Sequence, residues 1–360
     1  MRVAAASVRR VRLEFRRPLH TARGVVTVRD TLLLALTAAD GPTGYGEAAP
    51  WPGFGTESIE AAQAALDRAI AALVGADVEP DAPGATQDAL LRDAPAARAA
   101  LQGALWDLAA RCDGLSLAMR LAAAIRPGEP PARDVVATHA LLVGDTPDSV
   151  RASAVEARAA GFRAAKIKLG VGSIDEDVAR ARAARDGLGP DLRLRGDANG
   201  AWDAESAIAA LERLAPCGFE FIEQPLPADA LDALAALRRR SHVRIALDES
   251  AATSADVVRA IERGAADVVV LKPAFLGGPG RALALAQRVR AAGADVVYTH
   301  AMESSVGAHH ALHCAAADGD AAAIHGLCTA GLFVADVAEP VDAPHGLATV
   351  PDAPGLGVSP

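Results

Sequence analysis

Along the first part of the chain, the pattern of apolar and polar positions changes from strands to helices. The stretches Val3–Phe15 and Val25–Ala38 are rich in β-branched and apolar residues, as strands are. Two stretches with apolar residues at helical spacing follow, Glu57–Leu73 and Ala96–Cys112. A run of strands followed by a run of helices is typical of an α+β domain. We therefore expect residues 1–130 to form an α+β domain.

The pattern changes again between residues 131 and 330, where short apolar segments alternate with alanine- and arginine-rich helical stretches. This repeat predicts an α/β fold, a (β/α)-barrel of TIM type. An open doubly wound sheet is the alternative, but a Gly-rich phosphate turn would usually follow its first strand, and Leu142–Asp145 is not one. Residues 331–360 are irregular, and we expect them to run back over the first domain. The expected barrel strands are Val135–Leu142, Ala164–Leu169, Leu192–Asp197, Phe219–Glu223, Val243–Asp248, Val268–Lys272, Val296–Thr299 and Ala322–His325.

Charged residues mark the ends of five consecutive predicted barrel strands. In a parallel barrel, active residues sit at the C-terminal ends of the strands. A charge that directly follows an apolar run is costly to bury without a partner. For any single residue an ordinary ion pair explains the charge, but five consecutive strand ends favour a common site. The residues are Lys166 and Lys168, Asp197, Glu223, Asp248, and Lys272.

Three acids on adjacent strands would repel one another unless a cation lay among them. Mg²⁺ prefers oxygen ligands and leaves positions open for substrate or water. No Cys or His accompanies the acids, so Zn²⁺ fits less well, whereas Mn²⁺ is an acceptable substitute for Mg²⁺. A lysine close to a divalent cation has a lowered pKa and can act as a base near neutral pH. We therefore expect a magnesium site flanked by catalytic lysines.

The motifs KIK, DAN, EQP, DES and LKP, in this order and spacing, resemble those of the enolase superfamily, muconate-lactonizing subgroup. The resemblance runs from about Pro18 to Phe333. It implies an enolase-like modified barrel with a capping domain in residues 1–130. It also implies individual roles: the Mg²⁺ ligands Asp197, Glu223 and Asp248, the base Lys168 with Lys166 beside it, Lys272 on the opposite face, and Asn199 and Glu249 behind the ligands.

Two positions separate the chain from other members of the superfamily. The mandelate-racemase subgroup pairs a His on the seventh strand with an Asp on the sixth. Here the sixth strand ends in Lys272, so His300 is expected to be a structural or pocket residue. The first strand carries His139 where Asn is common, which leaves its contacts open.

Several segments are similar to the o-succinylbenzoate synthase family, among them GYGEAAPWPGFGTES and MESSVG. The resemblance implies a Mg²⁺-dependent hydro-lyase of menaquinone biosynthesis. The reaction would be a syn dehydration of 2-succinyl-6-hydroxy-2,4-cyclohexadiene-1-carboxylate through an enediolate. Loops from the cap and the seventh strand would contact this small carboxylate substrate. The expected substrate-binding residues are Thr21, Arg23, Gly24, Trp51, Phe54, Met302, Glu303, Ser304 and Ser305.

Other activities remain open. N-succinylamino acid racemases and further racemases or cycloisomerases of the subgroup use the same lysines. Dipeptide epimerases carry an acidic D-x-D motif at the eighth strand, and this chain has His325-Gly326-Leu327 there, which counts against them. A non-catalytic barrel that only binds ligands is the alternative from a different class of protein, and the intact set of acids and lysines argues against it.

The composition of the chain argues against nucleic-acid and membrane partners. The 360 residues are 51% hydrophobic and carry a formal net charge of −9, so a large core can form and a nucleic-acid surface is not expected. The N-terminus does not resemble a signal peptide and no long uncharged apolar run occurs, so we expect a cytoplasmic protein without a membrane partner. Four widely spaced cysteines are expected to be reduced. Homo-oligomerisation is left open.

His309 and His313 have the i, i+4 spacing of a zinc pair on a predicted helix. Without the Glu of an H-E-x-x-H motif this signal is weak. We expect these histidines, with His310 between them, to pack or face solvent.

Overall fold

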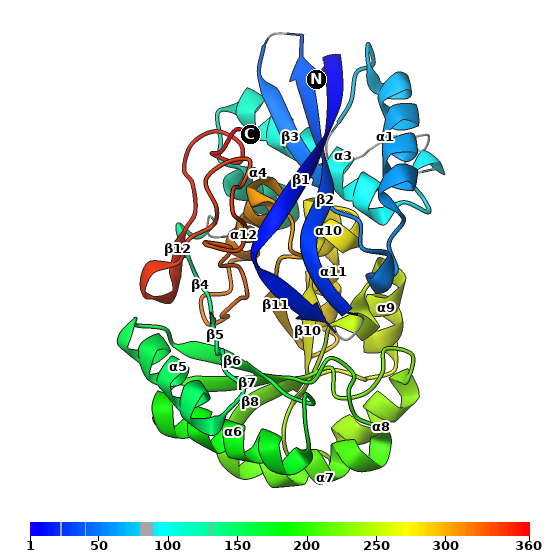
Figure 1. The fold of residues 1–360 in the computed structure, drawn as a ribbon. Helices are drawn as coiled ribbons and strands as arrows, with labels where there is room; N and C mark the ends of the chain where they lie inside the picture. Colours follow the sequence, from blue (N-terminus) through cyan, green and yellow to red (C-terminus); the bar gives the residue numbers. More distant parts are fainter. Residues whose placement is uncertain (22–23, 40, 80–88, 130–131) are drawn as a thin grey trace.

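The computed structural model describes all residues except 22–23, 40, 80–88 and 130–131, and leaves the side chains of His20 and Thr21 undescribed. It has a cap of strands and helices above a curled parallel sheet surrounded by helices (Figure 1). The α/β barrel with an α+β cap that the sequence predicts is confirmed.

The cap is built on a three-stranded antiparallel sheet with the order β1-β2-β3. Buried leucines of β2, such as Leu32, Leu34 and Leu36, form one core with the helices that cover the sheet. Helix α3 packs closely because β3 has glycine at position 46, where a Cβ atom would lie 1.9 Å from Ala100 O. The elements are β1 (Val3–Thr21), β2 (Gly24–Ala38), β3 (Thr43–Ala48), η1 (Pro52–Phe54), α1 (Ile59–Leu73), α3 (Pro95–Asp113) and α4 (Leu117–Ile125).

The barrel contains a seven-stranded parallel sheet with the order β11-β10-β9-β8-β7-β6-β5. Most residues of these strands are buried, as expected of a sheet covered on both faces. They are β5 (Ala140–Leu141), β6 (Ala164–Lys168), β7 (Arg193–Asp197), β8 (Phe219–Glu223), β9 (Ile245–Leu247), β10 (Val268–Leu271) and β11 (Asp295–Tyr298).

Helices surround the sheet, and several of them begin at residues that cap their free N–H groups. Ser173 and Glu176 form such a capping box at the start of α6, and Thr253 and Asp256 form another at α9. The helices are α5 (Pro147–Ala159), α6 (Ile174–Leu188), α7 (Ala204–Leu214), η2 (Ala215–Cys217), α8 (Leu231–Arg240), η3 (Glu249–Ala251), α9 (Ser254–Glu262), α10 (Pro273–Leu276), α11 (Pro279–Ala291) and α12 (Ser305–Asp318).

The first and eighth predicted strands differ from the expectation. The first is split into β4 (Val135–Ala137) and β5, because β4 pairs with β12 (Leu347–Thr349) instead of continuing into the barrel sheet. The eighth is reduced to single parallel bridges, Thr138 with His325 and Thr299 with Gly326. These bridges join both ends of the seven-stranded sheet, so a very short segment closes the barrel.

The C-terminal segment, which includes η4 (Pro344–Gly346), contacts both parts of the chain. Phe333 bridges Phe15 of β1, and the two rings lie 4.9 Å apart. Further along, Gly355 bridges Ser116 at the start of α4. The segment therefore links cap strands, cap helices and barrel.

The three histidines of α12 are buried and bound to backbone atoms. His309 Nδ1 lies 2.7 Å from Ser305 O, His310 Nε2 lies 3.0 Å from Tyr45 O, and His313 Nδ1 accepts from Ala118 N at 3.1 Å. Packing therefore accounts for them, and no zinc pair is needed. Within the described residues, Cys217, Cys314 and Cys328 form no disulfide. No helix within the described ranges has the length and apolar character that crossing a membrane requires.

Candidate active site

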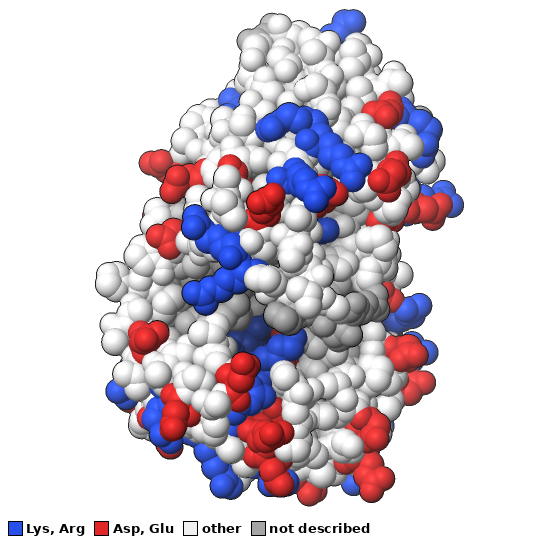
Figure 2. All heavy atoms as spheres, in the orientation of Figure 1, with Lys and Arg blue, Asp and Glu red and all other residues white. Residues whose placement is uncertain are grey.

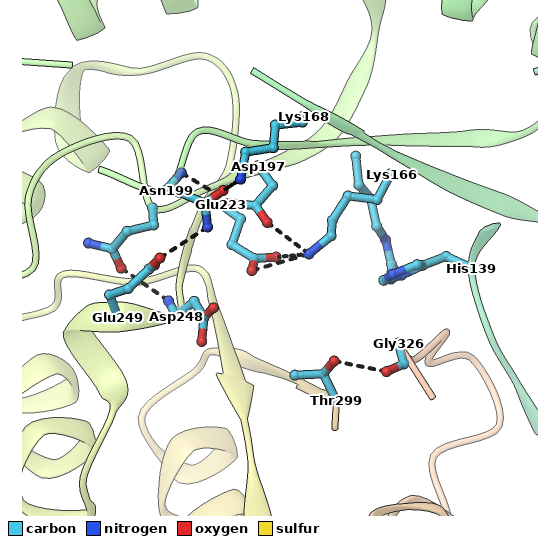
Figure 3. A network of polar contacts seen from close by, with 12 residues as sticks. His139, Lys166, Lys168, Asp197, Asn199, Glu223, Asp248, Glu249, Thr299 and Gly326 are labelled. Carbon is cyan, nitrogen blue, oxygen red and sulfur yellow. Dashed lines mark hydrogen bonds and ion pairs between the residues drawn. The ribbon is translucent and has the colours of Figure 1, made fainter. Parts of the chain in front are cut away.

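The three predicted acidic ligands lie side by side at one end of the barrel (Figure 3). Asp197 ends β7 and pairs in register with Glu223, which ends β8, and Asp248 directly follows β9. Glu223 and Asp248 are only 3% and 8% exposed. Three carboxylates so close together, in a largely buried position, require compensating positive charge.

In the described arrangement, two lysines supply that charge. Lys166 Nζ lies 3.0 Å from Asp197 Oδ2 and 3.3 Å from both carboxylate oxygens of Glu223. Lys272 Nζ donates to Asp248 Oδ1. Burial lowers the pKa of both lysines, but the neighbouring carboxylates outweigh burial and raise the pKa above its ordinary value. Both lysines are therefore held as ammonium ions among the acids, whereas the lowered pKa expected from sequence applies to a lysine beside a divalent cation.

The third lysine, Lys168, belongs to a different chain of contacts. Its Nζ donates to Asn199 Oδ1, and Asn199 Nδ2 donates to Glu249 Oε1 at 3.0 Å. Asn199 has a φ of 44°, a left-handed conformation that is uncommon for residues other than glycine. Its backbone N–H also donates to Asp197 Oδ1 at 3.2 Å. Asn199 therefore connects the lysine at the end of β6 to the acids.

The donor set fits a hard divalent cation. Burial and the charges of the neighbouring acids raise the pKa of Glu223 to about 8 and that of Glu249 to about 7. Glu249 Oε2 is buried without a hydrogen-bond partner. Among the described residues, no group of three His, Cys, Asp or Glu side chains is already arranged as a metal site, because the lysines lie between the acids. The acids nevertheless offer the oxygen ligands that Mg²⁺ prefers.

The cap contributes an aromatic cover to the site. The Phe54 ring packs against Phe275 with centroids 5.7 Å apart, and Lys272 Nζ lies 5.1 Å from the Phe54 ring centre. Trp51 contacts Phe54 edge to face at 5.8 Å. Figure 2 shows a hollow between cap and barrel on this face, with basic side chains inside it.

Comparison with known proteins agrees with this geometry. The family model described as "Enolase C-terminal domain-like" matches residues 149–360. The model described as "Mandelate racemase / muconate lactonizing enzyme, N-terminal domain" matches residues 4–121. The chain belongs to the enolase superfamily. The resemblance drawn from the motifs at the strand ends is thereby confirmed.

Relatives within the superfamily have different activities. A hydrophobic dipeptide epimerase from Enterococcus faecalis is 29% identical over the full length of both chains. Its crystal structure with Mg and the dipeptide L-Leu-L-Tyr matches with a TM-score of 0.89 and 27% identity, covering 100% of both chains. Muconate cycloisomerase 1 from Rhodococcus opacus is 31% identical over 95% of this chain and 91% of its own. An o-succinylbenzoate synthase from Mycolicibacterium smegmatis is 40% identical over 62% of this chain and 68% of its own.

Sequence reasoning missed the residues that hold the cap of this enolase-superfamily enzyme to its barrel. Arg29 is buried and donates to Pro50 O and Ala49 O, both at 2.5 Å, and to Met302 O at 3.3 Å. Glu47 is also buried and accepts from the backbone N–H groups of Ser304 and Gly307, each at 2.9 Å. The signal in the sequence was a charged residue shortly before an apolar stretch, Arg29 ahead of Leu32–Leu36 and Glu47 ahead of Ala48 and Ala49.

The predicted substrate-binding residues fall into two groups. Trp51 and Phe54 lie over the site, as described above, whereas Ser304 and Ser305 are fully buried and bind Glu47 and Asp336. Glu303 is buried as well and accepts from Ala301 N. Of these contacts, the one between Ser304 and Glu47 joins the barrel loop to the cap.

Among the remaining predicted contacts, Met302 lies where the barrel meets the cap strand β1. Met302 has a φ of 57° and packs against the Leu13, Phe15 and Phe333 cluster. Gly24 pairs with Thr21 at the β1–β2 connection. The side chain of Thr21 and all of Arg23 lie outside the described residues.

Two histidines face the barrel interior. His300 Nδ1 accepts from Met302 N at 3.2 Å, and burial together with Lys272 and Lys166 lowers the pKa of His300 to about 4. The neutral imidazole is therefore favoured, and its expected structural or pocket role stays a prediction. His139 lies beside Lys166 (Figure 3), and its ring contacts Arg195.

Proposed function

We propose that this enzyme removes a proton from the carbon next to a substrate carboxylate, with Asp197, Glu223 and Asp248 holding Mg²⁺. One observation carries the proposal. The sheet order places β6, with Lys166 and Lys168, on one side of the three strands that present the acids, and β10, followed by Lys272, on the other. Amines on two sides of a cation site can address both faces of a planar carbanion.

The bound cation would supply positive charge to the substrate carboxylate as negative charge develops on it. Lys168 is the proposed base, since it is exposed and is held by an amide oxygen rather than by a carboxylate. Lys166 stays among the acids and adds positive charge next to the substrate carboxylate. Trp51 and Phe54 exclude water from the reacting carbon, which strengthens every charge interaction in the site.

For the overall reaction, we propose the dehydration catalysed by o-succinylbenzoate synthases. Lys168 takes the ring proton, the C–O bond to the ring hydroxyl breaks, and the same lysine returns the proton to the leaving oxygen, so that water departs and the ring becomes aromatic. Lys272 stabilises the anion from the other face. The 40% identity to o-succinylbenzoate synthases over the matched region supports this choice.

Dipeptide epimerisation is the second candidate, because a dipeptide epimerase is among the relatives that match the full length of this chain. In that reaction Lys168 and Lys272 would each remove or return the α-proton from its own face. The site would also need an anionic partner for the free α-ammonium of a dipeptide. Among the described residues at the eighth strand, Ile324 to Leu327, none is acidic.

Turnover in D₂O separates the candidates. The purified enzyme with Mg²⁺ would be given 2-succinyl-6-hydroxy-2,4-cyclohexadiene-1-carboxylate, both enantiomers of N-succinylphenylalanine, and L-Leu-L-Tyr, with products followed by NMR. We expect dehydration of the first substrate. Epimerisation with deuterium incorporation only from the dipeptide would establish the second candidate instead, and exchange only from the N-succinyl compounds would establish a racemase.

Lysine variants test the roles of Lys168 and Lys272, which are proposed to act on opposite faces of the substrate carbanion. Lys168→Ala should abolish dehydration while Mg²⁺ binding, measured by calorimetry, is unchanged. Lys272→Ala should slow dehydration but, in a racemase or epimerase, should abolish inversion while α-proton exchange from one enantiomer persists. Dehydration by Lys168→Ala near the wild-type rate would refute the assigned base. Failure of the wild type to bind Mg²⁺ would favour a barrel that only binds ligands.

A further inference from the structure

His139 occupies a position inside the barrel that the proposed mechanism does not use. It lies between β4 and β5, is 8% exposed, and its backbone N–H donates to His325 O at 2.8 Å. Figure 3 shows the imidazole reaching from the first strand toward the site, beside Lys166 and above Gly326. Each ring nitrogen of a histidine this close to the reacting groups can form a hydrogen bond either with the protein or with a ligand.

The hydrogen-bond partner of Nδ1 fixes the tautomer of the ring. Arg195 Nη1 lies 3.1 Å from His139 Nδ1. A guanidinium nitrogen can only donate, so Nδ1 must accept. In a neutral imidazole the proton is then on Nε2, which becomes a hydrogen-bond donor.

Arg195 itself cannot move away easily. It is 1% exposed, its Nε donates to Glu220 Oε2 at 2.6 Å, and Nη1 donates to Ile324 O at 2.7 Å. Its guanidinium also stacks over the Phe221 ring at 4.8 Å. Three contacts therefore hold this arginine in the orientation that presents a donor to His139.

The other ring nitrogen, Nε2, forms no hydrogen bond with any of the described residues. It is not completely buried, so a ligand can reach it. Space next to it exists because residue 326 is glycine. A Cβ atom there would lie 3.1 Å from His139 Nε2 and 3.0 Å from Thr299 Oγ1.

We propose that His139 is a substrate-binding residue whose Nε2–H donates to a carboxylate or carbonyl oxygen of the substrate, in the tautomer that Arg195 fixes. This inference rests on the proposed function and narrows its substrate class. An N–H donor next to the Lys166 ammonium donates to an oxygen acceptor and disfavours an ammonium. The pocket wall formed by His139, Thr299 and Gly326 therefore selects acyl or carboxylate groups over the free α-ammonium of a dipeptide.

The tautomer can be measured without substrate. In ¹⁵N-histidine-labelled enzyme, the His139 signals are assigned by their loss in His139→Gln, and long-range ¹H–¹⁵N spectra report which ring nitrogen is protonated. We expect protonated Nε2 in the wild type and a mixture of tautomers in Arg195→Met. Protonation at Nδ1 in the wild type would overturn the proposal.

Binding tests the role in recognition. With Mg²⁺ present, His139→Phe should weaken binding of o-succinylbenzoate by about tenfold to a hundredfold, because one hydrogen bond to a charged acceptor is lost. His139→Gln keeps a donor close to the Nε2 position and should restore affinity to within about threefold of wild type. His242→Gln, at an exposed site, is the matched control and should bind as wild type does. Thermal melts establish that each variant is folded.

The outcomes distinguish this inference from the proposed function. Equal affinity of wild type and folded His139→Phe for o-succinylbenzoate would overturn the role of His139. Tighter binding of L-Leu-L-Tyr than of o-succinylbenzoate, unaffected by His139→Phe, would overturn it as well. Binding of o-succinylbenzoate that depends on His139 without turnover of the cyclohexadiene acid would sustain the His139 site and refute only the proposed reaction.

Discussion

The Lys272 ammonium nitrogen lies 5.1 Å from the centre of the Phe54 ring. This contact brings together a charged residue at the end of a barrel strand and an aromatic residue of the cap. An ammonium over an aromatic face is attracted to the ring, and the attraction increases when water is excluded. The position of the cap loop and the charge of the site are therefore linked.

Replacing Phe54 should impair catalysis more than folding. In Phe54→Ala, we expect kcat/KM to fall by about tenfold or more, because water then reaches Lys272 and the reacting carbon. Steady-state kinetics with the substrate identified in the D₂O experiment measures this. Phe54→Tyr keeps the ring and should stay within a few-fold of wild type. Equal activity of Phe54→Ala and wild type would show that the loop does not cover the substrate.

Removing the charge of Glu223 should weaken metal binding. Glu223→Gln keeps the size of the side chain but removes a negative charge from a site that needs a hard oxygen ligand. We expect Mg²⁺ affinity, measured by calorimetry, to drop at least tenfold, and the rise in Tm that Mg²⁺ gives to the wild type to become smaller. Glu212→Gln, on the exposed surface, is the control and should match the wild type. Unchanged affinity in Glu223→Gln would remove Glu223 from the ligand set.

Stability should depend on pH through Glu303. Burial and the neighbouring Glu47 raise the pKa of Glu303 to about 7 from an ordinary 4.5. The folded state then binds more protons than the unfolded state between these two values, so the free energy of unfolding decreases as pH rises from about 4.5 to about 7. Above that range the ionised Glu303 lowers stability by an amount on the order of 3 kcal/mol.

Glu303→Gln tests this dependence. The variant should be more stable than wild type at pH 8 and nearly equal to it at pH 5, in urea unfolding monitored by circular dichroism. The exposed Glu262→Gln serves as a control without an expected effect. A stability difference of the same size at both pH values would contradict the pKa assignment.

Loss of Arg29 should loosen the joint between cap and barrel. Arg29→Met removes the donors to Ala49 O, Pro50 O and Met302 O, and leaves Trp51 without the guanidinium that lies 4.6 Å from its ring. We expect the free energy of unfolding to fall by about 3 kcal/mol, since buried acceptors lose their partners. Urea unfolding measures the change. Arg12→Met, on the exposed face of β1, is the control. Unfolding of Arg29→Met at the wild-type midpoint would contradict this role.

The sequence alone was sufficient for the barrel and for the acids at its rim. Strands and helices alternate locally, and the C-terminal ends of parallel strands always meet at the same edge. A charge that ends an apolar strand, as in Asp197 or Glu223, is therefore placed without knowledge of any distant contact. The five strand-end motifs could be assigned to one site for this reason.

Only the tertiary structure decided which charges pair and which residues close the site. Lys166 bridges Asp197 and Glu223, Arg29 reaches Met302, and Arg195 fixes the ring of His139. The tertiary structure also decided that the eighth strand is reduced to single bridges and that β4 pairs with β12. Each of them joins residues far apart in the chain, and their energies depend on burial and distance, which the local pattern of a sequence does not contain.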